Sequence, residues 1–94
     1  LLGRSPEPAF YARVERAVLK VEGVEGVHDM IAEYIGPELV HMDMDIEVDP
    51  EMTVREADVI EQRVKRRLRA LNVASCEVHP CAHRGESRKI HREI

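Results

Sequence analysis

Residues 40–48 alternate strictly between apolar and polar side chains. The apolar residues stand at the even positions, and the odd positions are polar: His41, Asp43, Asp45 and Glu47. Because successive side chains of a strand point to opposite faces, the pattern predicts a β-strand with one buried face and a row of three carboxylates and one imidazole on the other. Such a row is either the solvated side of an antiparallel sheet or one wall of a cation site.

Two other segments repeat with a helical period. The first buried stripe consists of Phe10, Val14, Ala17, Val18 and Val21. Ser5 is the predicted N-cap of this helix and Gly23 its predicted end. The second stripe spans residues 54–71 and follows Thr53 and Glu56, which are spaced as a capping box. We therefore expect two amphipathic helices.

Three strands complete the predicted fold. A strand that reaches about Ile35 is joined to residues 40–48 by a short turn, and a third strand runs from Val73 to about Cys81. Since both helices need an apolar sheet face, we expect an open α+β two-layer sandwich in the order α-β-β-α-β, a three-stranded sheet with both helices on one face. The polar residues 82–94 are expected to form a disordered tail beyond a domain of residues 1–81.

Composition and charge narrow the class of protein. The chain has 94 residues, a formal net charge of -4 and 3% aromatic residues. Before the tail it has no dense basic segment and few aromatic rings for stacking, so we do not expect a nucleic-acid partner. No apolar run approaches the roughly 18 residues of a membrane span. Two cysteines fit free thiols in a reducing compartment, which predicts the cytosol or the cytosolic face of a membrane. The sequence lacks catalytic motifs, so we do not expect an enzyme.

The third strand adds candidate metal ligands. Glu77, His79 and Cys81 share one face if the strand persists past Pro80. Imidazole, thiolate and carboxylate together suit a borderline ion such as zinc, whereas carboxylates alone favour magnesium, calcium or manganese. The spacing lacks the paired Cys-x-x-Cys units of a structural zinc site, so a solvated strand face remains the alternative. Cys76 has the opposite parity and is expected to be a small buried residue.

Five stretches between Leu1 and about Cys81 form an ordered set. They are Leu1-Leu2-Gly3-Arg4-Ser5-Pro6, residues 21–29, Tyr34-Ile35-Gly36-Pro37, residues 46–57 and Val78-His79. Together they resemble the cytoplasmic C-terminal domain of the cation diffusion facilitator transporters, which export divalent metals in exchange for protons. The resemblance implies a ferredoxin-like, metallochaperone-like fold. It also implies a V-shaped homodimer below the transmembrane domain, in which metal bound at and near the dimer interface controls transport.

The resemblance also implies individual metal ligands. His28 and His79 stand where the family has ligating histidines. Asp45 and Asp58 stand where it usually has further histidines, and Cys81 stands where it usually has an acid. Carboxylate in place of imidazole favours manganese or ferrous iron, whereas Cys81 favours zinc. Divergent branches, including the magnetosome iron transporters, vary at these positions. Zinc is therefore the first expectation, manganese and ferrous iron stay open, and so does a decayed site in a domain that only dimerises.

Two other functions fit parts of the pattern. A stand-alone soluble metallochaperone of the heavy-metal-associated type shares the rhythm of residues 14–27, but it carries its metal on a Cys-x-x-Cys before the first helix, where this chain has Ser5-Pro6-Glu7-Pro8. A ligand-binding regulatory module of ferredoxin-like topology is the second, and the sequence has no glycine-rich ligand loop for it. The transporter domain is therefore the expected function.

Overall fold

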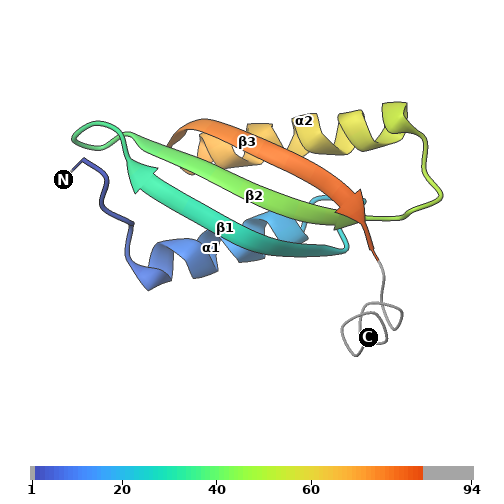
Figure 1. Cartoon of the computed structure of the whole chain (residues 1–94), viewed down its shortest axis with the longest axis horizontal. Coiled ribbons are helices and arrows are strands. Elements are labelled where there is room, and N and C mark those ends of the chain that lie inside the picture. The colour runs from blue at the N-terminus through green and yellow to red at the C-terminus, as the bar shows by residue number, and fades with distance from the viewer. Residues whose placement is uncertain (1, 84–94) are drawn as a thin grey trace.

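Two helices and three strands follow one another in the predicted order (Figure 1). They are α1 (Pro8–Leu19), β1 (Gly26–Tyr34), β2 (Val40–Val48), α2 (Val54–Ala70) and β3 (Val73–Ala82). The computed structural model describes residues 2–83. β2 has the predicted limits, and β3 extends one residue beyond its predicted end. The expected disordered tail falls, apart from Ala82 and His83, on residues 84–94, which lie outside the described residues, so the domain limit stays a prediction.

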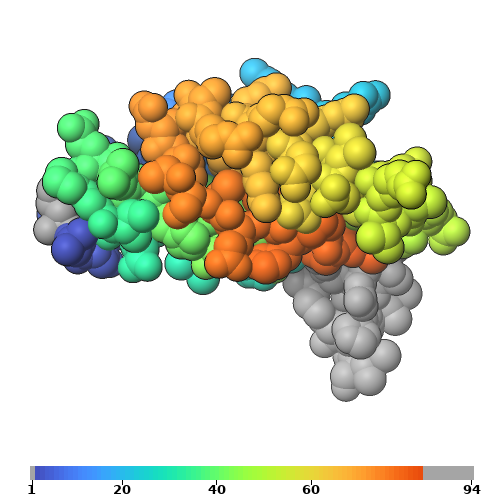
Figure 2. All heavy atoms as spheres, turned by 90° about the horizontal axis from the view of Figure 1, so that it is seen from above, coloured from blue at the N-terminus to red at the C-terminus, as the bar shows by residue number. Residues whose placement is uncertain are grey.

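The three strands form one sheet in the order β1-β2-β3. β1 and β2 are antiparallel and joined by the hairpin, whereas β2 and β3 run parallel. A parallel pair needs a long crossover connection, which α2 provides. Figure 2 shows α2 and β3 side by side along one side of the molecule. β2 is therefore the central strand, and its polar residues have neighbours on both sides.

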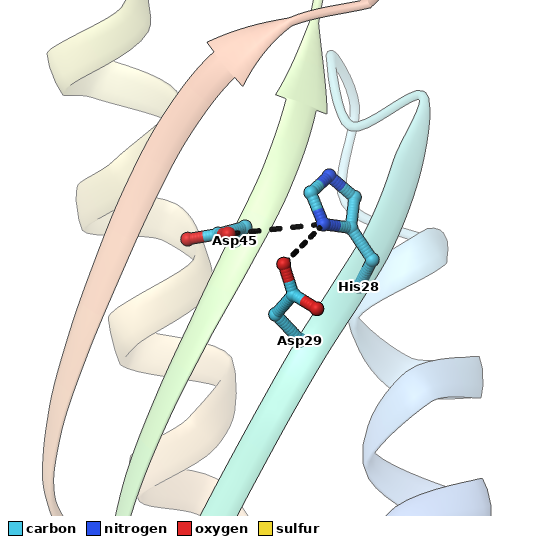
Figure 3. A group of neighbouring side chains, drawn as sticks. All are labelled: His28, Asp29 and Asp45. Carbon is cyan, nitrogen blue, oxygen red and sulfur yellow. Dashed lines mark hydrogen bonds and ion pairs between the residues drawn. The ribbon is translucent and has the colours of Figure 1, made fainter. Parts of the chain in front are cut away.

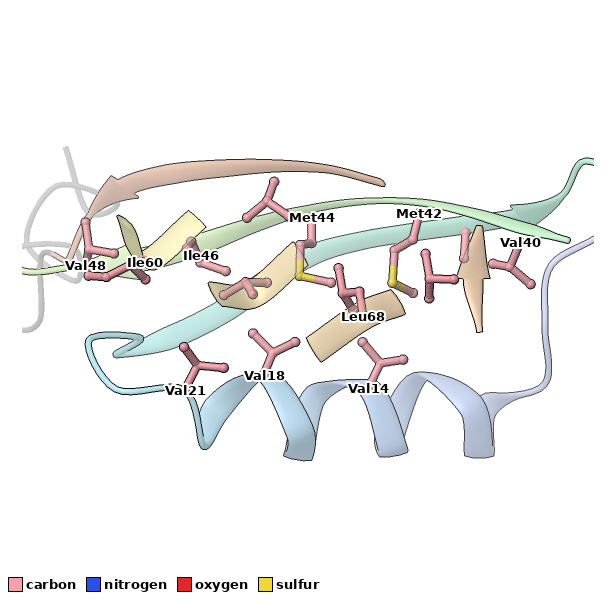
Figure 4. Packing of buried hydrophobic residues seen from close by; sticks show 14 residues of the cluster. Val14, Val18, Val21, Val40, Met42, Met44, Ile46, Val48, Ile60 and Leu68 are labelled. Carbon is pink, nitrogen blue, oxygen red and sulfur yellow. The ribbon is translucent and has the colours of Figure 1, made fainter. Parts of the chain in front are cut away.

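Both helices cover the same face of the sheet, as predicted (Figure 4). The side chains of Met42, Met44 and Ile46 on β2 are at most 1% exposed. They share the core with apolar residues of both helices: Val14, Val18, Ile60, Val64 and Leu68. Fully burying an aliphatic side chain of this kind stabilises the fold by about 1.5–3 kcal/mol. The alternation of residues 40–48 thus separates a core face from an open polar face, and the two-layer α+β fold is confirmed.

The predicted start of α1 is wrong. The helix begins at Pro8, with Glu7 as an N-cap that makes no side-chain capping bond. Ser5 Oγ instead donates to the carbonyl oxygen of Ala32 in β1, at 3.2 Å, so it does not cap the helix. A following proline disfavours the helical backbone at Glu7, which has ψ of 154°. Pro8 suits the first helical position because it has no N–H to satisfy.

The other predicted helix signals have a mixed outcome. The capping box is confirmed, because the Glu56 N–H donates to Thr53 Oγ1 at 3.0 Å and the Thr53 N–H donates to Glu56 Oε1 at 2.8 Å. Gly23 lies beyond the last residue of α1, in a turn with φ of 99°. This is the left-handed region that glycine adopts without steric cost. Gly23 therefore shapes the turn into β1, and the helix has already ended.

Candidate metal centre

The open face of the sheet carries a row of three predicted ligands, one on each strand. His28 of β1 is paired with Asp45 of β2, and Asp45 is paired with His79 of β3. Directly opposed residues of neighbouring strands have side chains within reach of one another. Both helices pack on the other face, so the row is not covered by them. The strand register alone therefore brings together residues that are far apart in the sequence.

A β-bulge in β1 adds a donor that strand parity does not predict. The pairing of β1 with β2 shifts between His28 and Ile31, and Asp29 within the shift has φ of 54°. Aspartate tolerates this left-handed conformation better than most residues, and a bulge re-aims the side chain. Asp29 Oδ2 consequently lies 3.1 Å from His28 Nδ1, and Asp45 Oδ2 lies 3.7 Å from the same nitrogen (Figure 3). The three residues offer donor atoms within 4.8 Å of one another.

The second nitrogen of the His28 ring faces different groups. His28 Nε2 lies 3.4 Å from Glu47 Oε2 and 3.6 Å from Cys81 Sγ. The Cys81 thiol also lies 3.3 Å from the carbonyl oxygen of Ile46, to which it donates. The His28 ring therefore has two carboxylates near Nδ1, from Asp29 and Asp45. Near Nε2 it has the carboxylate of Glu47 and the thiol of Cys81.

Glu47 is buried, although the alternation predicts a place in the solvated row. It is 6% exposed and is the one buried charged residue among residues 2–83. Its Oε1 accepts a hydrogen bond from His83 Nδ1 at 2.8 Å. A Cβ on Gly26, the residue opposite on β1, would lie 2.6 Å from that oxygen. The space for the carboxylate thus depends on Gly26 in the neighbouring strand. The sequence alone does not predict the burial of Glu47, because the strand register is needed to place Gly26 opposite it.

The remaining predicted residues lie apart from the His28 ring. His79 is exposed, and within residues 2–83 its ring makes no hydrogen bond or ion pair despite its place beside Asp45. Asp58 is exposed on α2, on the other side of the sheet, so a single chain does not bring it to His28. Cys76 contacts the core from β3, as expected, and burial raises the pKa of its thiol.

A second group of possible ligands lies further along the open face. It consists of His41, Asp43 and Glu77. His41 Nε2 lies 3.1 Å from Asp43 Oδ1, and His41 Nδ1 lies 2.7 Å from Ser75 Oγ. Both ring nitrogens of His41 have hydrogen-bonding partners, as those of His28 also do, so a polar network accounts for this group as readily as an ion does. This part of the face fits the solvated interpretation of the alternating row.

The group around His28 Nδ1 has the donor chemistry of a divalent-cation site. Bonds of about 2.1 Å to nitrogen and oxygen place neighbouring ligands about 3.0–3.4 Å apart. The distances of 3.1 and 3.7 Å from Nδ1 to the two aspartates lie in or near this range. A cation also relieves the repulsion between neighbouring carboxylates. Small side-chain movements would therefore allow Asp29, Asp45 and His28 to bind one ion.

Comparison with known proteins places the chain in a family. Residues 6–82 match the family described as cation efflux protein, cytoplasmic domain. An uncharacterised transporter of Methanocaldococcus jannaschii is 40% identical over 80 residues, which make up 84% of this chain and 28% of the relative. The chain therefore spans less than a third of that transporter.

Solved structures of the MamM CTD have the same fold. A variant in its cadmium form has a TM-score of 0.76 and 32% identity, covering 81% of this chain and 96% of the MamM chain. A variant in its nickel form has a TM-score of 0.77 and 33% identity, covering 82% and 99% of the two chains. No helix within residues 2–83 is long and apolar enough to cross a bilayer. On the match over most of its length, the chain belongs to the cation efflux protein family and is a cytoplasmic domain of that family.

Proposed function

We propose that the chain is the cytosolic regulatory and homodimerisation domain of a proton-coupled efflux transporter for divalent metals. The family match and the archaeal transporter support the transporter context. In this proposal the transmembrane part belongs to the larger protein, of which the chain is a fraction. The observation that carries the regulatory role is the convergence of Asp29 and Asp45 on His28 Nδ1 at the open face of the sheet.

The proposed metal site lies around His28 on this open face. Asp29 and Asp45 supply carboxylates, and His79 is the next donor along the row. The cadmium and nickel forms of the MamM CTD support a divalent ion. Zinc remains the first candidate because imidazole is present, while the two carboxylates keep manganese and ferrous iron as candidates. Asp58 takes part only across a dimer interface, since its own helix lies behind the sheet.

Metal binding would act on the transporter by shifting the arrangement of the two domains of a dimer. A ligand at a hundred times its dissociation constant stabilises the binding-competent state by about 2.7 kcal/mol. That free energy shifts a balanced equilibrium between two dimer conformations about a hundredfold. A site near the interface therefore needs only ordinary affinity to control the attached membrane part. Binding also weakens in acid, because a metal-binding imidazole must be neutral.

Calorimetric titration of the metal-stripped chain tests the proposal. Zinc, manganese and ferrous iron are titrated separately, the iron without oxygen, and sedimentation of the same samples measures the oligomer. We expect saturable binding to a pre-existing dimer that is lost in His28→Ala and retained in His41→Ala, whose ring belongs to the neighbouring polar network.

His79→Ala should also abolish saturable binding while the dimer persists. Unchanged binding in that variant would remove His79 from the site. A stable wild-type dimer that binds none of the three ions would refute metal sensing and leave dimerisation as the function. A monomer at every concentration would refute the homodimer itself.

A further inference from the structure

Four basic residues from two separate elements line one cleft in the helix layer. Lys20 is the C-cap of α1, and the other three lie on α2: Arg63, Arg66 and Arg67. The cleft has a volume of about 400 Å³ and is open to solvent. Because the packing of α1 against α2 brings Lys20 to the arginines, the sequence alone does not predict this group.

The positive charge of this cleft is poorly balanced. Glu22 is the one acid that lines it among residues 2–83, and its Oε1 lies 3.9 Å from Arg63 Nη1 on a side chain that is 94% exposed. A long, exposed ion pair of this kind contributes little to stability. Lys20 and Arg66 make no ion pair within the described part of the chain. Like charges three or four positions apart on a helix repel each other, so an anionic ligand would relieve repulsion on this side of α2.

One of the four cations also has a structural role. Arg67 Nη1 donates to the carbonyl oxygen of Ala17 at 3.3 Å. Ala17 lies in the last turn of α1, where the carbonyl groups form the negative end of the helix dipole. This contact holds Arg67 across the space between the helices. Within residues 2–83, Arg63 and Arg66 make no bond to a carbonyl group of α1, so helix capping does not account for them.

The chemistry of the cleft favours a phosphate group as the ligand. A guanidinium presents parallel N–H donors that fit two oxygens of one phosphate, and it stays charged at physiological pH. Among the described residues, no aromatic side chain lines the cleft, so it has no surface on which a nucleobase could stack. A phosphate can therefore bind between the helices while the rest of its molecule lies outside the protein.

The family of the chain indicates the source of the phosphate. A cytoplasmic domain of a cation efflux protein belongs to a membrane transporter, so phospholipid headgroups are its abundant phosphate groups. Clusters of basic residues are attracted to anionic leaflets. The chain has a net charge of -4, and the carboxylates around His28 lie on the side of the sheet away from both helices. An anionic bilayer should therefore attract the cleft and repel the open face of the sheet.

We propose that the cleft between α1 and α2, lined by Lys20, Arg63, Arg66 and Arg67, binds the phosphate groups of anionic phospholipids. The helix layer then faces the bilayer, and the open face of the sheet is turned away from it. The inference goes beyond the proposed function, because it needs the membrane context of the family and does not depend on metal binding.

Vesicle sedimentation with the full chain tests the proposal. Vesicles of phosphatidylcholine mixed with phosphatidylglycerol are compared with vesicles of phosphatidylcholine alone, and the bound fraction is measured against lipid concentration. We expect binding to the anionic vesicles only. Loss of one cation should weaken it about fivefold in Arg63→Gln and in Arg66→Gln. Glu22→Gln, which removes the acid of the cleft, should bind more tightly than the wild type.

Arg55→Gln is the matched control, because it changes the net charge by the same amount. Arg55 is exposed near the start of α2 and does not line the cleft. It lies eight residues before Arg63, which is about 12 Å along a helix axis and exceeds the Debye length of about 8–10 Å at moderate salt. We expect wild-type affinity in this variant. An equal loss in Arg55→Gln and Arg66→Gln, or equal binding to neutral vesicles, would overturn the proposal.

Soluble ligands separate the possible sources of the phosphate. Inorganic phosphate and glycerol phosphate are titrated calorimetrically, and a single-stranded RNA is tested against the vesicles. We expect the wild-type chain to prefer the anionic vesicles to all three. Tight, saturable binding of either small phosphate would overturn the assignment to headgroups, and so would a preference for RNA.

The metal titrations keep this inference distinct from the proposed function. Zinc and manganese binding should be the same in Arg63→Gln, Arg66→Gln and the wild type, because the cleft and the His28 group lie on opposite sides of the sheet. If the wild-type chain binds metal but no anionic vesicles, the proposed function stands and the inference is refuted. If it binds anionic vesicles through the cleft but no metal, the inference stands and metal sensing is refuted.

Discussion

Replacing Gly26 by alanine should displace the Glu47 carboxylate without disturbing the β1 backbone. The new Cβ would lie 2.6 Å from Glu47 Oε1, whereas ordinary van der Waals contact begins at 3.4 Å, so the oxygen must move by about 0.8 Å. The hydrogen bond from His83 Nδ1 to this oxygen is 2.8 Å long. Where the oxygen moves directly away from His83, this distance lengthens to about 3.6 Å, which is beyond the range of a hydrogen bond, and this is the largest effect that the displacement can have.

The magnitude follows from two opposed terms. A hydrogen bond to a charged group contributes about 1.5–3 kcal/mol to stability, and most of this is lost when the carboxylate moves. Alanine in a strand interior is about 0.5–1 kcal/mol more favourable than glycine, which offsets part of the loss. Gly26→Ala should therefore lower the free energy of unfolding by about 0.5–2.5 kcal/mol. In a Glu47→Ala background the clash is absent, so the same substitution should stabilise by about 0.5–1 kcal/mol.

A double-mutant cycle measures this coupling. The four proteins are unfolded in urea at one protein concentration with chelator present, because dimerisation and bound metal would both shift the apparent stability. We expect a coupling energy of about 1.5–3 kcal/mol between positions 26 and 47. Gly36→Ala is the control, since its Cβ would meet Leu39 and should show no coupling to Glu47. Additivity of Gly26→Ala and Glu47→Ala within about 0.5 kcal/mol would refute the reasoning.

Three further predictions concern other parts of the fold. Gly23→Ala should lower the free energy of unfolding in urea by about 2–4 kcal/mol, because φ of 99° strains alanine and the new Cβ meets the Ile60 side chain. Gly3→Ala is the control, since with φ of 82° and nothing within 4 Å of the Cβ it should show the backbone cost alone. Equal losses of stability in the two variants would contradict the contribution from packing against Ile60. Thr53→Ala removes the N-cap of α2 and should lower the free energy of unfolding by about 1 kcal/mol in the same assay. Unchanged stability would show that water replaces the capping hydrogen bond. Cys76 should react slowly with iodoacetamide at neutral pH and faster in alkali, because burial raises the pKa of its thiol. Mass spectrometry measures the rate of labelling, and a rate equal to that of the unfolded chain would disprove the prediction.

Features that depend on local spacing could be predicted from the sequence. The strict alternation predicts both limits of β2, and the spacing of Thr53 and Glu56 predicts the start of α2. The apolar stripes of the two helices must both be buried, and the three strands offer one apolar face, so both helices are predicted on that face of the sheet. The start of α1 differs from the prediction because two pairs, Ser5-Pro6 and Glu7-Pro8, can each begin a helix, and the hydrogen bond that Ser5 donates to Ala32 in β1 favours the later start.

The site depends on features that local patterns do not contain. Parity places Asp29 on the helix side of β1, and only a bulge in the pairing with β2 turns it toward His28. A sequence signal exists, since aspartate is among the few residues that tolerate positive φ, but it does not identify the bulge. The predicted residues Asp45 and Cys81 do lie around the His28 ring, whereas His79 is paired with Asp45 on β2 and Asp58 lies behind the sheet.

The His28 ring links the two interpretations that the alternating row left open. At residues 41 and 43 the row is a hydrogen-bonded polar surface, while at residues 45 and 47 it flanks a histidine whose two nitrogens meet different donors. A neutral imidazole has one acceptor nitrogen, so whichever nitrogen binds metal leaves the other as a donor to a carboxylate already in place. Both neutral tautomers of His28 therefore have a carboxylate in place to accept from the nitrogen that carries the proton.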